Sequence, residues 1–153
     1  MRFTDFTHHD LLLLLQGLGV SVALFAATTA IGLLLGLSWA MLRYYRTPML
    51  APLSALLAEL LKNSPVLVQL FLVFFGLPVL LQTDLTPVEA ALITLSGNTA
   101  AFVYVIAVSA IESVGREQLE TARVFGLSRW QTLWRVGVPQ AAAFGFGALA
   151  GLL

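Results

Sequence analysis

The stretch LLLLLQGLGVSVALFAATTAIGLLLGLSWAML, from Leu11 to Leu42, decides the fold because thirty-two consecutive residues carry no charge. About eighteen apolar residues in a row already indicate a transmembrane helix. At about 1.5 Å per residue the stretch would measure about 48 Å as a helix, against roughly 30 Å of bilayer hydrocarbon. We therefore predict a first membrane span over residues 19–42, with the turns from Leu11 to Gln16 at the membrane interface.

The overall composition also indicates a membrane protein. Hydrophobic residues make up 59% of the 153 residues and charged residues 10%, whereas soluble domains average about half apolar and a quarter charged. The formal net charge is zero, so no global charge excess indicates a nucleic-acid partner. The chain has no cysteine, which excludes disulfides, thiol catalysis and thiolate metal sites. We expect an all-α fold, a polytopic transmembrane helical bundle.

Three further stretches are predicted to enter the membrane. They comprise residues 65–81, 88–111 and 137–153. Glu89 is expected to cap the first turn of the third span, and a short surface helix is expected over residues 53–62. Pro139 is expected to break the helical pattern of the fourth stretch, which leaves fourteen residues, or about 21 Å of helix. The chain is thus predicted as one incomplete domain over residues 1–153, with three full spans plus the start of a fourth.

Lysine and arginine residues near the span ends predict the orientation in the membrane. Arg2 lies alone on one predicted side, and seven basic residues lie on the other. These seven are Arg43, Arg46, Lys62, Arg116, Arg123, Arg129 and Arg135. We therefore predict that the amino terminus and the turn at Asp84 face outward, and that a loop over residues 112–136 faces the cytoplasm.

The predicted cytoplasmic loop is unusually charged, since residues 112–135 hold seven of the sixteen acidic and basic side chains. Gly126 is a natural helix end, and Ser128 followed by Gln131 fits a capping box, so two short helices are expected to meet at Gly126. Trp130 and Trp134 then share one face of the second helix, as suits the lipid headgroup layer. A solvated loop with an interfacial helix explains these residues as well as a docking role does.

Two classes of protein are weighed for this loop and the spans around it. The loop resembles the spacing of a DNA-binding helix-turn-helix at Ala122, Gly126, Leu127, Ser128 and Thr132. The last of these stands one residue late, two tryptophans occupy the supposed recognition helix, and no third helix completes a core, which counts against a membrane-tethered regulator. An intramembrane enzyme lacks a converging set of serine, histidine and acid. Adjacent histidines, His8 and His9, are expected to be solvated and not to bind a metal.

Three stretches carry a resemblance to a known family. Glu120-Thr121-Ala122, Gly126 and the run from Val136 to Pro139 resemble the EAA signature of bacterial ABC importer permeases. The stretches KNSPVLVQLFLVFFGLP (62–78) and LSGNTAAFVYVIAVSAIESVGREQLETARVFGLS (95–128) resemble the polar amino acid branch of that family. The resemblance covers about residues 11–142, and its three stretches stand in the correct order.

The resemblance implies a permease subunit of the bacterial inner membrane that takes up polar amino acids. Glu120, Thr121, Ala122 and Gly126 would belong to a cytoplasmic coupling helix, which seats in a groove of a separate ATPase. The other implied partners are a second permease subunit, in a homodimer or a heterodimer, and an external solute-binding protein. This chain is expected to bind no cofactor: it has no G-x-x-x-x-G-K-[ST] motif and a single lysine, Lys62, so ATP is expected on the partner ATPase.

Several residues depart from the family pattern or leave their role open. Val105 and Val108 stand where relatives often have glutamate and arginine, so this subunit is expected to be the one less concerned with substrate. Polar side chains at membrane depth mark helix contacts or a solute path. Asn98 fits either role equally, and helix packing is favoured for Gln69.

Close helix approach is a further possibility at two glycine pairs. The G-x-x-x-G pairs Gly32 with Gly36 and Gly147 with Gly151 would permit it. Because glycine is common in membrane spans, chance is the favoured explanation for both pairs.

Overall fold

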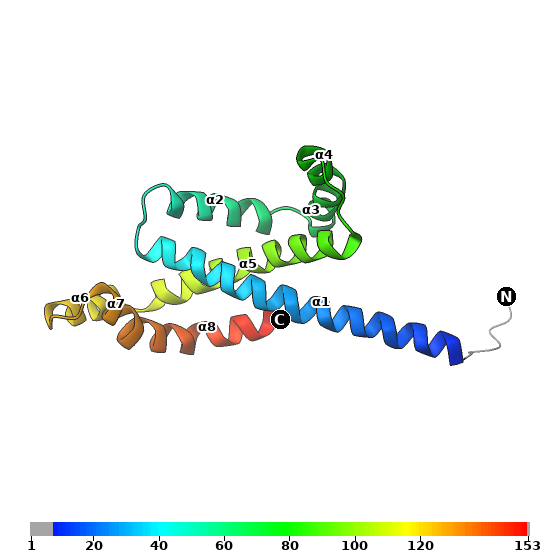
Figure 1. Ribbon diagram of the computed structural model, residues 1–153. Coiled ribbons are helices and arrows are strands. Elements are labelled where there is room, and N and C mark those ends of the chain that lie inside the picture. The colour runs from blue at the N-terminus through cyan, green and yellow to red at the C-terminus, as the bar shows by residue number, and fades with distance from the viewer. Residues whose placement is uncertain (1–7, 153) are drawn as a thin grey trace.

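The computed structural model describes residues 8–152, and within that range the chain folds into helices without a strand (Figure 1). The elements are α1 His8–Tyr44, α2 Leu50–Lys62, α3 Val66–Phe71, η1 Leu72–Gly76, α4 Leu77–Leu81, α5 Pro87–Ser113, α6 Arg116–Val124, α7 Arg129–Thr132, η2 Leu133–Gly137 and α8 Val138–Leu152. The all-α prediction is confirmed. Arg2, on which the predicted orientation partly depends, and Leu153 lie outside the described residues.

Helix α5 is the centre of the bundle, since it contacts α1, α2, α3 and α8. Small side chains make this packing close: Ala40 of α1, Ala58 of α2 and Ala101 of α5 are buried together. Lipid offers no hydrophobic drive for helix association, so close van der Waals packing between small residues stabilises the bundle instead. In Figure 1, α1 crosses α5 and continues well beyond it toward the amino terminus.

The glycine pair in α1 proves to be structural. A Cβ atom added at Gly32 would lie 2.5 Å from the Thr99 Cβ, and one added at Gly36 would lie 2.5 Å from the Ala100 carbonyl oxygen. Chance was therefore the wrong explanation for this pair, because only glycine lets α1 and α5 approach so closely. Gly147 and Gly151 have open space around them among the described residues.

Two helices are long and apolar enough to cross a membrane alone, over His9–Tyr44 and Pro87–Ser113. They contain the first and third predicted spans. The first is longer than predicted, because nothing in the leucine run at its start interrupts the helix. The capping role of Glu89 is confirmed: its backbone N–H donates to Thr86 Oγ1 at 3.2 Å, and the Thr86 N–H donates to Glu89 Oε2 at 2.8 Å.

The second predicted span has a different form. Leu50–Lys62 and Val66–Leu81 reach spanning length only as a pair, and they are bent by 108° at the break between them. The expected surface helix is thus part of the bundle, because Ala51, Ser54 and Ala58 form one buried face of α2.

The position of α2 also bears on the predicted orientation in the membrane, because Lys62 at its end was counted among the seven basic residues of one side. The helix runs back along α5, and Leu61 near its end lies against Asn98, part-way along α5. Lys62 therefore does not share an end of the bundle with Arg43 and Arg46, and it drops out of the count that predicted the orientation.

The helix break predicted at Pro139 does not occur, since helical structure continues from Arg129 to Leu152. A π-helical turn, Leu133–Gly137, stands just before this proline, and a second, Leu72–Gly76, stands just before Pro78. Proline in an α-helix lacks the N–H and clashes with the carbonyl four residues earlier. The wider π turn relieves that clash, so both helices continue through the proline.

Candidate functional site

The charged loop forms a helical hairpin, α6 followed by α7, at one end of the bundle (Figure 1). Gly126 ends α6 with a φ of +86°. Around it the Leu127 N–H donates to the Ala122 carbonyl at 3.2 Å, and the Gly126 N–H donates to the Arg123 carbonyl at 2.9 Å. This pair of hydrogen bonds is the Schellman motif, which requires a left-handed residue at this position. The predicted role of Gly126 as a helix end is confirmed.

The second arm of the hairpin starts with the predicted capping box. The Ser128 N–H donates to Gln131 Oε1 at 2.9 Å, and the Gln131 N–H donates to Ser128 Oγ at 3.3 Å. The rings of Trp130 and Trp134 then lie 5.3 Å apart, so the two indoles share one face as expected. Both tryptophan side chains are exposed.

The signature residues of α6 are divided between two faces. Glu120 and Thr121 are exposed, whereas Ala122 is only 9% exposed. A role for these residues in coupling to an ATPase stays a prediction. Leu119, three residues before Ala122 on the same face, is packed against the buried Val114. This inner face holds α6 against α7 and η2, which it contacts.

Two apolar side chains at the tip of α6 were missed by the sequence reasoning. Val124 is 85% exposed and Phe125 is 80% exposed. They directly precede Gly126, whose turn projects them from the end of the helix. The available signal was an apolar pair at the end of a charged helix, outside every predicted span. We define the hairpin tip as Glu120, Thr121, Val124 and Phe125.

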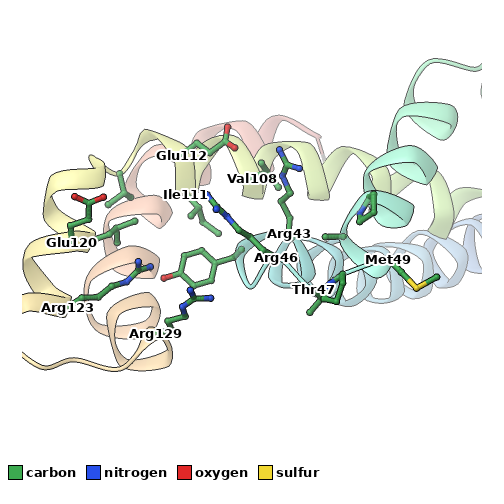
Figure 2. A pocket seen from close by; sticks show the side chains of 17 residues that line it. Arg43, Arg46, Thr47, Met49, Val108, Ile111, Glu112, Glu120, Arg123 and Arg129 are labelled. Carbon is green, nitrogen blue, oxygen red and sulfur yellow. The ribbon is translucent and has the colours of Figure 1, made fainter.

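A cleft of about 1050 Å³ lies beside the hairpin, between the end of α1, the loop into α2, the end of α5 and helices α6 and α7 (Figure 2). Its charged lining residues are Arg43, Arg46, Glu112, Glu120, Arg123 and Arg129. Tyr44 also lines it and meets Tyr45 edge-on, with 5.2 Å between the ring centres. Burial and then the neighbouring Tyr44 raise the pKa of Tyr45 above its ordinary value of 10.0, so its hydroxyl stays protonated at neutral pH.

The structure brings the two candidate solute-path residues to one point. Gln69 Nε2 donates to the Leu61 carbonyl at 2.6 Å, and Asn98 Nδ2 lies 3.5 Å from the same oxygen. The same nitrogen lies 3.0 Å from the Ser64 carbonyl and 2.9 Å from Ser64 Oγ, so its two N–H groups are shared among three acceptors. These contacts tie α3 and α5 to the bend after α2, which is the packing role. A place for Gln69 and Asn98 in a solute path stays a prediction.

Replacing Gln69 with leucine is expected to destabilise the fold by about 2–3 kcal/mol, because each hydrogen bond contributes about 1 kcal/mol and buried carbonyls lose a partner. Thermal unfolding in detergent measures this. Gln16→Leu is the matched control, since Gln16 is exposed in α1. Equal unfolding temperatures for the two variants would contradict the structural role of Gln69.

The long apolar helices, the glycine-mediated contact and the polar hairpin at one end define an integral membrane protein of the helical-bundle class. The family described as "Binding-protein-dependent transport system inner membrane component" matches residues 32–150. The chain belongs to this family and is therefore an integral inner membrane protein.

Curated relatives agree with this family. The chain is 32% identical over 139 residues to the probable amino-acid ABC transporter permease protein YckA of Bacillus subtilis, covering 91% of this chain and 61% of that protein. It is 36% identical over 126 residues to the probable glutamine ABC transporter permease protein GlnP of the same organism, covering 80% and 57%. The chain thus spans about three fifths of the length of these relatives. Both relatives are described as permeases.

A solved structure, described as an amino acid ABC transporter with histidines, has the same fold. It aligns with a TM-score of 0.74 over 98% of this chain and 71% of that chain, at 24% identity. The predicted helical-bundle fold class is confirmed by this similarity.

Proposed function

We propose that this chain is part of the permease subunit of an ATP-binding-cassette importer that takes up polar amino acids. The proposal is supported by the family, by the descriptions of the relatives, and by the signature residues around Gly126. The hairpin faces the cytoplasm and the amino terminus faces outward. The working assembly adds a second permease subunit, two ATPase subunits and an external solute-binding protein.

The observation that carries the proposal is the hairpin tip. Val124 and Phe125 are 85% and 80% exposed at a polar end of the bundle, next to the exposed Glu120. Exposed aromatic side chains of this kind act as anchors in partner pockets, and a carboxylate beside them adds charge-assisted hydrogen bonds. The tip therefore seats in a groove of the ATPase, and ATP is bound by that partner.

The hairpin can transmit movement because it is firmly joined to the membrane helices. Val114 is 2% exposed and packs with Ala110 of α5, Ala141 of α8 and Leu119 of α6. Leu133, in the turn that leads into α8, is fully buried. A displacement of the tip would therefore move α5 and α8 with it, as rigid bodies that alternate access to a solute path.

Replacing Phe125 with alanine is expected to weaken binding of the ATPase subunit by about tenfold or more, because a central aromatic anchor contributes about 2 kcal/mol or more. The full-length permease is captured from membranes and its affinity for the purified ATPase subunit is measured. Trp130→Ala removes another exposed aromatic side chain from the same hairpin and is the control. Equal affinity for the two variants would refute docking through the tip.

A further inference from the structure

The cleft beside the hairpin has a lining that is rich in hydrogen-bond donors. Four arginines line it, against the two carboxylates of Glu112 and Glu120. Figure 2 shows the guanidinium groups of Arg46, Arg123 and Arg129 directed into the space between the end of α1 and the hairpin. Arginine has five donors, no acceptor and a permanent charge. A ligand for this cleft must therefore be an anion with several acceptor oxygens.

The arginines of the cleft have no carboxylate partner of their own. Over the part of the chain that the structure describes, the one ion pair joins Lys62 to Glu59, away from the cleft. The Tyr44 hydroxyl, which also belongs to the lining, is buried and has no hydrogen-bond partner. Buried hydroxyl groups in proteins are normally hydrogen-bonded, and the neighbouring Tyr45 hydroxyl is likewise buried without a partner, so this end of α1 has unused hydrogen-bonding capacity beside the arginines. Phosphate oxygens accept from both arginine and tyrosine, and arginine binds them in bidentate fashion.

The position of the cleft indicates where such a phosphate would come from. The cleft lies at the end of α1, a helix long and apolar enough to span a membrane. Arg43 and Arg46 directly follow its uncharged run, and basic residues at the ends of membrane spans commonly lie near the lipid headgroups. Met49 of the lining is 83% exposed, and Leu50 and Leu53, which follow it in the chain but do not line the cleft, are 51% and 50% exposed. Basic pockets between membrane helices commonly bind anionic headgroups, and exposed apolar residues beside such a pocket suit the start of the acyl chains.

We propose that this cleft binds the phosphate headgroup of an anionic phospholipid, drawn from the leaflet in which α1 ends. The lipid sits between the end of α1 and the hairpin, with its phosphate among Arg46, Arg123 and Arg129. Because α6 supplies one wall of the cleft, the bound lipid couples the position of the hairpin to the lipid composition of the membrane. Binding of this headgroup does not depend on which solute the protein transports.

The test uses the full-length permease, purified in a neutral detergent both in its assembled transporter and without the ATPase subunits. Dioctanoyl phosphatidylglycerol, dioctanoyl phosphatidylcholine and inorganic phosphate are each titrated, and bound lipid is counted by native mass spectrometry. Phosphatidylglycerol is expected to bind at least about tenfold more tightly than phosphatidylcholine, since each arginine near a headgroup favours negative charge. The double variant R46Q/R129Q is expected to lose most of this preference.

The double variant K62Q/R135Q is the matched control, because it removes two positive charges that do not line the cleft. It is expected to keep the wild-type affinity. Equal binding of the two lipids, or equal loss in both double variants, would overturn the proposal. Inorganic phosphate binding as tightly as phosphatidylglycerol would assign the cleft to a free phosphate compound instead. Lipid binding that disappears when the ATPase is present would assign the arginines to that partner.

Discussion

Replacing Gly36 with valine is expected to separate α1 from α5 and to destabilise the bundle by about 3 kcal/mol or more, at the upper end of the cost of overpacking. The first added atom, the Cβ, would already lie 2.5 Å from the Ala100 carbonyl oxygen and 2.7 Å from the Val103 Cβ. The oxygen belongs to the backbone of the central helix, so no side-chain rotation can relieve the overlap. The helices must move apart, and the van der Waals contact that holds them in lipid is lost.

Thermal unfolding of the full-length protein in detergent measures the effect. Gly19→Val is the matched control, because it makes the same substitution in the same helix where nothing lies within 4 Å of the added Cβ. Both substitutions replace a flexible glycine with the same valine side chain. Only Gly36→Val should therefore unfold at a much lower temperature. If the two variants unfold together, the close approach of α1 and α5 is not what stabilises the bundle.

Local chemistry explains which features could be predicted from the sequence. The helix end at Gly126 and the two capping boxes, at Thr86 and Ser128, each depend on residues within five positions of one another. Such short-range hydrogen bonds leave a recognisable spacing. The long uncharged runs, Leu11–Leu42 and residues 90–111, likewise predict the spans over residues 19–42 and 88–111, because charged side chains are costly in the hydrocarbon layer.

The features that were missed depend on partners distant in sequence. Two identical G-x-x-x-G patterns exist, and only the one that faces Thr99 and Ala100 is a contact, which no local rule can decide. The burial of α2 has the same origin: its row of small residues at 51, 54 and 58 becomes meaningful once α5 lies beside it. The two π turns have a recurrent pattern, LVFFGLP and LWRVGVP, in which glycine stands two residues before proline.

In the candidate site, too, the features that depend on local spacing could be predicted, and those that depend on residues distant in sequence could not. Gly126 could be assigned from spacing, whereas the burial of Ala122 depends on how α6 packs against η2. The exposed Phe125 follows from the direction in which the Gly126 turn projects the chain. The arginine cleft draws residues from α1, α6 and α7, so it has no continuous sequence signature.

Replacing Gly126 with valine is expected to uncouple solute uptake from ATP hydrolysis while leaving membrane insertion intact. The φ of Gly126 is +86°, a region in which residues with a Cβ are disfavoured by about 1–2 kcal/mol, and β-branched residues by more. The Schellman hydrogen bonds at the end of α6 are then lost or displaced, and with them the direction of Val124 and Phe125. A penalty of this size reduces the population of the docking geometry by about tenfold.

Gly115→Val provides the comparison, because Gly115 stands at the other end of α6 and both glycines have open space for a Cβ. The φ of Gly115 is −52°, which valine adopts readily. Uptake and ATP hydrolysis are measured together in proteoliposomes that contain the complete transporter. We expect solute moved per ATP to fall by about tenfold in Gly126→Val and to change little in Gly115→Val.

The variant Gly126→Asn separates the backbone effect from the loss of glycine itself. Asparagine tolerates the left-handed region better than any other residue with a side chain of similar size, so it should restore most of the coupling. Unchanged uptake per ATP in Gly126→Val would argue against the hairpin as the coupling element, whatever solute is carried. Equal losses in the valine and asparagine variants would show that contact at this position, and not the left-handed turn, is what the ATPase requires.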